Sequence, residues 1–428
     1  MAENIKQKNI IPKGYIFSGI NCGINPKKSK NDLALFFSDY PCKVSALFTK
    51  NLAAAAPVVT DKKHLLKTKT NYRAIIVNSG NANACTGRQG LINSEKMCSL
   101  TAKTLNLNPG QVLVSSTGVI GRHLPIDKIE TGIKKISKTV ALKQSSPKEA
   151  VAGIMTTDTF PKVTSQKFQI SNFPSFKTRR GPIDFCTTSK SPISNVLIWG
   201  CAKGAGMIHP DMATMLCYLF TDANITGKLL DKALKNAVNS TFNSISVDGD
   251  TSTNDTVILM ANAAAKNKLI DKENSKEYKL FADKLYAACF DLAKMIIKDG
   301  EGATKFVTIK VLSAKNETDA KKVAATIATS PLVKTAIFGA DPNWGRIIAA
   351  AGRSGASFNP EQTDIFINNY CVLKKGTPTS TSLKIVSKSF KSKEIEIILN
   401  LHCGKAQSQY YTCDLTYDYV KINADYTT

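Results

Sequence analysis

Short apolar runs alternate with longer amphipathic segments along the whole chain. Each apolar run has the length of a strand and is bounded by polar or turn-forming residues. The runs lie at residues 74–77, 111–115, 195–199, 215–220, 257–260, 306–312 and 395–401. This alternation predicts an α/β fold, in which the apolar runs form strands and the segments between them form helices.

The clearest helix is predicted at residues 276–298, where apolar side chains recur at every third or fourth position. They are Tyr278, Phe281, Leu285, Ala288, Leu292 and Met295, and the pattern stops before Gly300. A second amphipathic helix is predicted at residues 228–242. Residues 172–194 are rich in Ser, Thr, Pro and Lys and are predicted to form a loop or linker.

The composition is that of a globular protein. The chain has 428 residues, of which 43% are hydrophobic and 21% are charged, enough for two or three domains with cores of their own. The first residues carry no apolar segment of the kind found in signal peptides, and no run reaches the roughly 18 apolar residues of a membrane span. Eleven cysteines without a C-x-x-C pair suit a reducing compartment better than disulfides or a zinc site. We therefore expect a cytoplasmic protein with no metal centre and no membrane partner.

The formal net charge is +24 at pH 7, which raises the question of nucleic-acid binding. The lysines are spread in twos and threes along the chain, as at residues 27–30, 62–63, 134–135 and 374–375. No basic stretch is interleaved with aromatic residues. We therefore expect a solvated basic surface that attracts small anionic substrates, and no nucleic-acid partner.

Four segments rich in Gly, Asn and Thr adjoin the predicted strands, where active sites of α/β proteins collect. They are VNSGNANACTG (77–87), VSSTGVIG (114–121), SVDGDTSTNDT (246–256) and GADPNWGR (339–346). In the second, Thr117 and Gly118 could direct a hydroxyl and a backbone N–H at a developing oxyanion, although a plain turn has the same composition. In the third, Asp248, Asp250 and Asn254 suggest a calcium loop, but the EF-hand spacing with its final glutamate is absent, which favours a capped turn.

Thr214 lies behind the glycine-rich segment KGAGM (203–207) and immediately before an apolar run. A threonine hydroxyl becomes nucleophilic when a base removes its proton, and cleavage of the Ala213–Thr214 bond would create such a base, the α-amino group of Thr214. The chain has no H-E-x-x-H, G-x-S-x-G or Walker motif, which favours a nucleophile that needs no histidine. From this segment alone, an ordinary turn leading into a buried strand is the simpler interpretation.

Seven segments in one order resemble the ornithine acetyltransferase (glutamate N-acetyltransferase) family of arginine biosynthesis. They are VNSGNANACTG, SSTGVIG, TTDTFPK, KGAGMIHPDMATML, SVDGDTSTNDT, DPNWGRI and CDLTYDYVKINADYTT, and the similarity covers residues 12–428. The resemblance implies self-cleavage between Ala213 and Thr214 into an alpha chain, 1–213, and a beta chain, 214–428, two of each forming a heterotetramer. It also implies stacked mixed sheets flanked by helices, an α/β/β/α sandwich, with a smaller α/β C-terminal subdomain at about 305–410.

The resemblance also assigns roles to individual residues. Thr214 resembles the nucleophile that takes the acetyl group, and Thr117 and Gly118 resemble the oxyanion hole. The implied substrate-binding positions are Thr156, Lys203, Thr214, Glu301, Asn423 and Thr428, with Thr157 as the alternative to its neighbour Thr156. Two positions depart from the family pattern, since Asp211 stands where asparagine is usual and Ala205 where serine is common, and their effect on cleavage is open.

The implied activity is transfer of the acetyl group from N-acetylornithine to glutamate through an acetyl-threonine intermediate. It requires no cofactor, and it leaves open whether acetyl-CoA is also a substrate that acetylates glutamate. Two other functions stay open. One is a related self-cleaving amidase or aminopeptidase, in which water takes the acyl group, and the other is a non-catalytic basic binding protein.

Overall fold

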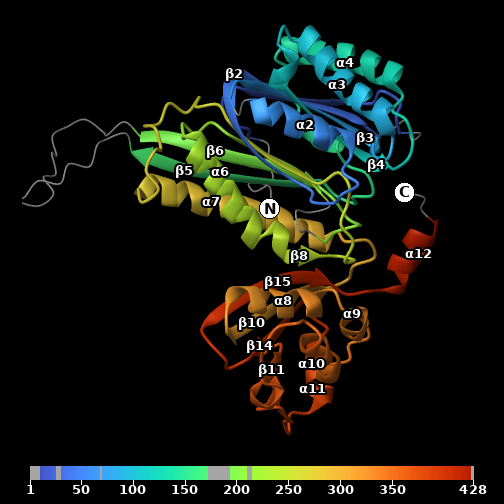
Figure 1. The fold of residues 1–428 in the computed structure, drawn as a ribbon, viewed down its shortest axis with the longest axis vertical. Coiled ribbons are helices and arrows are strands. Elements are labelled where there is room, and N and C mark those ends of the chain that lie inside the picture. The colour runs from blue at the N-terminus through green and yellow to red at the C-terminus, as the bar shows by residue number, and fades with distance from the viewer. Residues whose placement is uncertain (1–9, 26–29, 68–69, 172–192, 210–214, 426–428) are drawn as a thin grey trace, which may run out of the picture.

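Two mixed β-sheets and the helices that cover them make up the fold (Figure 1). The computed structural model describes residues 10–25, 30–67, 70–171, 193–209 and 215–425. Within these residues the larger sheet has eight strands in the order β4-β3-β2-β9-β7-β6-β5, with β1 paired to β2. Its strands are β1 (Tyr15–Ile20), β2 (Leu33–Phe48), β3 (Tyr72–Asn81), β4 (Val112–Val119), β5 (Lys162–Ser171), β6 (Ile193–Lys203), β7 (Leu216–Thr221) and β9 (Thr256–Ala261).

Strand β2 is long and belongs to two layers. Its first half pairs with β1 and β3, whereas its second half, residues 43–48, pairs with β9. The register with β3 shifts between Phe37 and Cys42, where the polar sequence SDYP interrupts the apolar run. The larger sheet is therefore divided into two half-sheets, β1 to β4 on one side and β5, β6, β7 and β9 on the other.

An aromatic cluster joins the two half-sheets face to face. Phe17 and Phe36 from the first half-sheet meet Tyr218 and Phe220 from the second, with ring centroids 4.6 Å apart for Phe17 and Phe220 and 5.1 Å apart for Phe36 and Tyr218. Trp199 of β6 completes the cluster, and all five side chains are fully buried. Aromatic rings bury large apolar areas, so this cluster is a main source of stability between the layers.

Helices cover the outer faces of both half-sheets. Helices α3 (Gly87–Thr104) and α4 (Ile126–Ala141) pack on the first, and α6 (Gly227–Ser240) and α7 (Lys276–Lys298) pack on the second. Helix α2 (Ala56–Lys67) lies against β4, and α5 (Pro147–Ala152) lies against β1 and β2. The layers therefore follow one another in the order helix, sheet, sheet, helix, which confirms the predicted α/β/β/α sandwich.

The smaller sheet lies below the sandwich in Figure 1 and has seven strands in the order β13-β12-β11-β14-β10-β15-β8. Its strands are β8 (Ile245–Ser246), β10 (Phe306–Ala314), β11 (Asp364–Ile367), β12 (Tyr370–Lys374), β13 (Thr377–Pro378), β14 (Glu394–Asn400) and β15 (Ala406–Cys413). Its helices are α8 (Glu317–Ala328), α9 (Pro331–Phe338), α10 (Trp344–Gly352) and α11 (Leu383–Ser389). Apart from β8, this unit comes from one continuous stretch of chain.

The last helix, α12 (Tyr417–Asp425), leaves the smaller sheet and returns to the sandwich (Figure 1). Just before it, the Thr416 hydroxyl donates to the carbonyl of Gly302, at 2.8 Å. Gly302 has φ +69°, and a Cβ there would lie 2.5 Å from the backbone nitrogen of Tyr419. A glycine at this position is therefore needed for α12 to approach the loop after α7.

The predicted strands and helices are confirmed, with small differences at their ends. Helix α6 stops at Ser240, and the last residues of the predicted helix enter a 3₁₀ turn, η2 (Phe242–Ser244). Two further 3₁₀ turns, η1 (Pro109–Gln111) and η3 (Pro360–Gln362), begin at prolines. Of the predicted loop 172–194, residues 193–194 begin β6, and residues 172–192 lie outside the described part of the chain.

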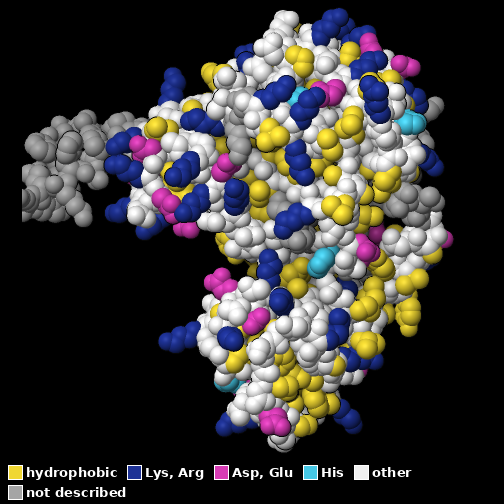
Figure 2. All heavy atoms as spheres, viewed as in Figure 1, with side chains coloured by type: hydrophobic (Ala, Val, Ile, Leu, Met, Phe, Trp, Pro, Cys, Tyr) yellow, Lys and Arg dark blue, Asp and Glu magenta, His cyan; other side chains and the backbone are white. Residues whose placement is uncertain are grey.

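Lys and Arg side chains are dispersed over the face drawn in Figure 2, between areas of other residue types. No helix in the described ranges is long and apolar enough to span a bilayer.

Candidate active site

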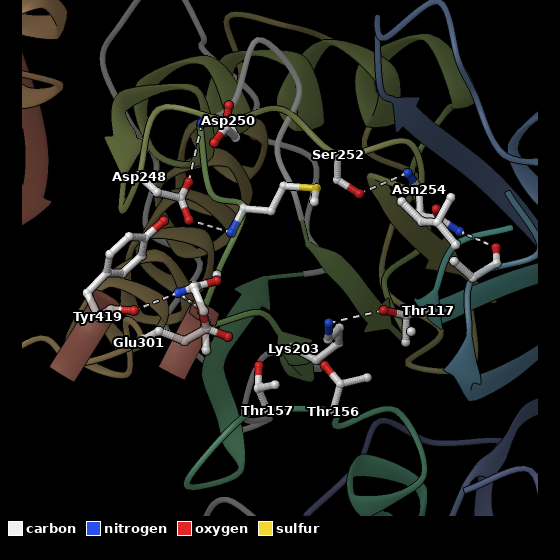
Figure 3. Close-up of a pocket in the computed structure, with 17 residues that line it drawn as sticks. Thr117, Thr156, Thr157, Lys203, Asp248, Asp250, Ser252, Asn254, Glu301 and Tyr419 are labelled. Carbon is white, nitrogen blue, oxygen red and sulfur yellow. Dashed lines mark hydrogen bonds between the residues drawn. The ribbon is translucent and has the colours of Figure 1, made fainter. Parts of the chain in front are cut away.

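A pocket of about 180 Å³ opens at the ends of β4 and β6 (Figure 3). Every predicted site residue that the structure describes lines this pocket. They are Thr117, Gly118, Thr156, Lys203, Glu301 and Asn423, together with Thr157 and Ala205. The sandwich supplies most of these residues, and helix α12 supplies Asn423 and Tyr419.

Thr117 and Gly118 form one corner of the pocket at the end of β4. The Thr117 hydroxyl accepts a hydrogen bond from the Lys203 ammonium at 3.1 Å, so its own proton is free to be donated into the pocket. Gly118 has φ +133°, and a Cβ there would lie only 2.3 Å from the carbonyl carbon of Gly80. The close approach of the paired strands β3 and β4 at this point therefore requires glycine.

Asn254 holds this corner in place. Its side-chain nitrogen donates to the carbonyls of Ala82, at 2.7 Å, and Ser116, at 2.8 Å. Its side-chain oxygen accepts from the Thr253 hydroxyl at 2.6 Å, so the buried amide is bonded through both of its polar atoms. Because Ser116 precedes Thr117, these bonds fix the peptide that carries the proposed oxyanion donor.

Lys203, the last residue of β6, lies between Thr117 and the pair Thr156 and Thr157 in Figure 3. Burial lowers the pKa of its ammonium below the ordinary lysine value, although the negative charges of Asp158, Asp255 and Glu301 act in the opposite direction. A cation at this position suits the α-carboxylate of an amino-acid substrate.

A buried ion network lies beneath the pocket and connects three of its loops. Lys162, which is fully buried, forms salt bridges with both Asp158 and Asp299. Asp158 also accepts hydrogen bonds from the backbone N–H groups of Gly204, at 2.8 Å, and Thr156, at 3.0 Å. The network therefore fixes the neighbours of Lys203 and the Thr156 loop, and through Asp299 the start of the loop that carries Glu301.

The charges in this network compensate one another. Burial by itself would raise the pKa of Asp158, but the positive charges of Lys203 and Lys162 and the Gly204 hydrogen bond lower it below the ordinary value. Asp299 is bonded in addition by the backbone N–H and the hydroxyl of Thr159. Buried charges of this kind are tolerated only when they are paired and hydrogen-bonded.

Carboxylates line the opposite wall of the pocket (Figure 3). Glu301 accepts a hydrogen bond from the Asn423 side chain at 3.1 Å, and a Cβ at Gly206 would lie 2.4 Å from the Glu301 carboxylate. Asp248 accepts from the backbone N–H groups of Met207 and Ile208, and burial raises its pKa. With Asp250 these groups make an acidic wall that faces the cationic wall formed by Lys203.

Asp248 also accepts from the backbone N–H of Asp250, at 3.3 Å, as in a turn capped by its own side chain. In the described part of the chain no three His, Cys, Asp or Glu side chains are grouped so as to hold a metal ion.

Four predicted positions lie outside the described residues, namely Ala213, Thr214, Asp211 and Thr428. The chain around the first three is described up to His209 and again from Met215. Leu216, which begins β7, pairs with Lys203 of β6. Thr156 and Thr157 both line the pocket, so the geometry does not choose between them.

Sequence reasoning missed the residues that support the pocket. Asp158 and Lys162 lie in the segment TTDTFPK and Asp299 lies beside Glu301, so the motifs that indicated the site also contained its supports. Asp255 was also missed, and it is buried. Burial raises the pKa of Asp255 well above the ordinary value.

Comparison with known proteins identifies the relatives of this chain. The model of the ArgJ family matches residues 16–179 and 183–428. The "Arginine biosynthesis bifunctional protein ArgJ" of Caldanaerobacter subterraneus subsp. tengcongensis is 44% identical over 422 residues, which cover 98% of each chain. The protein of the same name from Thermotoga neapolitana is 42% identical over 422 residues, which cover 98% of this chain and 100% of the relative.

Solved structures are also similar in sequence. The crystal structure of the arginine biosynthesis bifunctional protein ArgJ from Bacillus halodurans is 47% identical and covers 48% of this chain and 96% of its own, with a TM-score of 0.47. The ornithine acetyltransferase of Mycobacterium tuberculosis in complex with ornithine is 30% identical and covers 47% of this chain and 93% of its own, with a TM-score of 0.36.

Proposed function

The chain belongs to the ArgJ family, and from this premise we propose that it is a bifunctional acetyltransferase of arginine biosynthesis. It moves the acetyl group of N-acetylornithine to glutamate and so releases ornithine. One observation carries the proposal: a single small pocket combines a hydroxyl and a backbone turn suited to an oxyanion, a cation and a carboxylate wall. An N-acetylated amino acid with a basic side chain needs these groups together.

Thr214 is the proposed nucleophile. In the sequence, Thr214 stands two residues before Leu216, which pairs with Lys203 at the pocket. After cleavage of the Ala213–Thr214 bond, the α-amino group of Thr214 takes the proton of its own hydroxyl, since such an amine titrates at about 7.7 to 8.0. The hydroxyl oxygen then attacks the acetyl carbonyl.

The oxyanion that forms is stabilised by the Thr117 hydroxyl and the Gly118 N–H. Because Lys203 already donates to the Thr117 oxygen, the hydroxyl proton is polarised toward the pocket. The amine of ornithine leaves with the proton held by Thr214, and the acetyl group remains as an ester on Thr214. The amine of glutamate then attacks this ester, and N-acetylglutamate is released.

Opposite walls of the pocket hold opposite ends of the substrate. The α-carboxylate of N-acetylornithine binds Lys203 and the threonines Thr156 or Thr157 beside it. The side-chain ammonium lies against Glu301 and Asn423, close to Asp248 and Asp250. Thr428 is proposed as a further contact from the end of the chain. No prosthetic group is involved.

Further parts of the proposal concern maturation and assembly. The chain cleaves itself into 1–213 and 214–428, the products stay together as a heterotetramer of two alpha and two beta chains, and the enzyme works in the cytoplasm. Acetyl-CoA is the proposed second acetyl donor, which makes the enzyme bifunctional.

The test is an assay of purified protein with N-acetylornithine, with and without glutamate. We expect N-acetylglutamate and ornithine with glutamate, and without it no more than one ornithine released per site, because the acetyl group stays on Thr214. The matched variant Thr214→Ala has no hydroxyl and is expected to remain one chain and to be inactive, as measured by gel electrophoresis and by the same assay.

Two results contradict this proposal. Sustained release of acetate without glutamate identifies a self-cleaving hydrolase instead. Cleavage of the Thr214→Ala chain at the same bond contradicts the proposed autocatalytic role of Thr214, because alanine has no group that can attack the preceding carbonyl.

A further inference from the structure

A larger cleft of about 780 Å³ adjoins the proposed active-site pocket, and Thr156, Thr157 and Glu301 line both. Its walls come from the loop after β1, the ends of β3 and β4, the loop after α7 and one face of α12. The pocket itself has about 180 Å³, below the roughly 300 to 1,000 Å³ of sites that enclose a drug-sized ligand. A donor larger than an amino acid therefore has to extend out of the pocket, and this cleft adjoins it through shared walls.

Residues 22–25, which begin the loop on one side of the cleft, are fixed by hydrogen bonds within the protein. The Asp32 carboxylate accepts four backbone hydrogen bonds from consecutive residues, at 2.7 Å from Cys22, 3.1 Å from Gly23, 2.7 Å from Ile24 and 2.9 Å from Asn25. Asp32 is fully buried. Ile24 and Asn25 both line the cleft, so this wall is held in one conformation.

Cations occur on three walls of the cleft, at Lys30, Arg122 and Lys298. Lys298 already forms a salt bridge with Glu394, at 2.8 Å. Lys30 and Arg122 are exposed, and neither charged group has a hydrogen bond or ion pair with another described residue. An unengaged guanidinium is well suited to bind phosphate through two parallel hydrogen bonds.

The acidic groups of the cleft lie elsewhere or are neutralised. Asp299 is buried and paired with Lys162, and Glu301 is bonded to Asn423 at the boundary with the small pocket. Asp418, in the first turn of α12, is the exposed carboxylate of the lining. The positive charge available to an anion is thus that of Lys30 and Arg122.

We propose that this cleft binds the phosphorylated leaving group of a thioester donor, the nucleotide end of acetyl-CoA, with Lys30 and Arg122 as its phosphate-binding residues. The inference rests on the proposed function. The thioester carbonyl lies at Thr117 and Gly118, and the carbon chain that carries the sulfur runs past Thr156 and Thr157 into the cleft. Attack by the Thr214 hydroxyl forms the ester C–O bond and breaks the C–S bond, and the thiolate leaves with the hydroxyl proton as a free thiol.

The decisive experiment compares two thioester donors that differ in their phosphates. Acetyl-CoA carries the nucleotide, and S-acetylpantetheine has the same reactive end without phosphate. In the double variant Lys30→Glu and Arg122→Glu, we expect the KM for acetyl-CoA to rise about tenfold or more, because charge-assisted hydrogen bonds are lost and repulsion replaces them. The KM for S-acetylpantetheine and the rate of transfer from N-acetylornithine to glutamate stay as in the parent enzyme.

Lys235→Glu on helix α6 is the control, because it repeats the charge change of Lys30→Glu at an exposed lysine that lines no part of the cleft. An unchanged KM for acetyl-CoA in the double variant overturns the inference, and so does an equal rise with both thioesters. A parent enzyme that transfers from N-acetylornithine but does not use acetyl-CoA overturns it as well, while the proposed transferase function stands. Absence of both activities in the parent enzyme contradicts the proposed function itself.

Discussion

The two lysines with the least exposed surface in the described part of the chain, at 0% for Lys162 and 4% for Lys334, lie in different surroundings. Lys162, in the sandwich, is paired with the carboxylates of Asp158 and Asp299. Lys334, on α9 beside the smaller sheet, donates instead to neutral groups, the hydroxyl of Thr412 at 3.0 Å and the carbonyl of Cys413. Of these two lysines, the one with charged partners is the one under the pocket.

The surroundings of the two lysines correspond to different roles of the sandwich and of the smaller sheet with its helices. Around the smaller sheet, the core consists almost entirely of aliphatic side chains, and Lys334 ties α9 to the end of β15, from which the chain continues into α12. In the sandwich, polar groups are buried at the strand ends and bond the loops that line the pocket. The difference indicates that the smaller sheet positions α12, while the buried ion network positions the reacting groups.

The largest effect is expected from Lys162→Met. It keeps most of the side-chain volume but leaves two buried carboxylates without their cation, which costs about 3 to 5 kcal/mol of stability. Since Asp158 and Asp299 hold the loops of Thr156, Lys203 and Glu301, kcat/KM for acetyl transfer should fall as well. The measurements are the thermal unfolding midpoint and steady-state kinetics.

The control for this variant is Lys167→Met, at an exposed position of the same strand. Unchanged kinetics in a folded Lys162→Met enzyme would falsify the positioning role of the network.

A smaller effect is expected from Lys334→Met, which makes the same change in the other region. This substitution leaves no carboxylate without a cation. It removes only hydrogen bonds to buried neutral groups, which lowers the free energy of unfolding by about 1 to 3 kcal/mol. We expect a lower unfolding midpoint with kcat unchanged. If kcat falls as far as in Lys162→Met, the proposed division between the two regions is wrong.

The smallest effect is a pH dependence that involves a third lysine, Lys203. Burial lowers its pKa, so raising the pH removes its charge earlier than for an exposed lysine. The KM for N-acetylornithine should therefore rise between neutral pH and the ordinary lysine value of about 10.4, because the substrate carboxylate loses its partner. Initial rates at several pH values give KM separately from kcat.

Lys203→Arg is the comparison for this pH series, because arginine keeps its charge throughout the range. Its KM should change less with pH, whatever its absolute value. Parallel KM profiles for the two enzymes would show that another group causes the change.

The sequence predicted the layers well because apolar runs mark strands wherever those strands are buried. Strand β7 is buried along its whole length, and residues 215–220 were predicted on that pattern. Strand β2 was not predicted, since the polar residues between Phe37 and Cys42 interrupt its pattern at the point where it passes from one half-sheet to the other. The pattern of apolar residues within a short segment does not show that one strand continues from one half-sheet into the other.

The site was predictable to the extent that motifs mark it. Lys203, Glu301 and Asn423 come from distant motifs, and the structure brings them to one pocket with Thr117 and Gly118. The bond between Lys162 and Asp299 joins residues 137 positions apart, and no spacing rule connects them in the sequence. Burial of a lysine is likewise a property of the folded layers, since most lysines are exposed.

The order of strands in the larger sheet has a consequence for the life of the proposed mature enzyme. Strands β7 and β9 would belong to the second product, and they lie between β2 and β6 of the first. The second half-sheet is thus shared by the two polypeptides, with β5 and β6 from the first product and β7 and β9 from the second. Cutting the chain would leave a nicked but inseparable particle, in which parting the products is the same event as unfolding the enzyme.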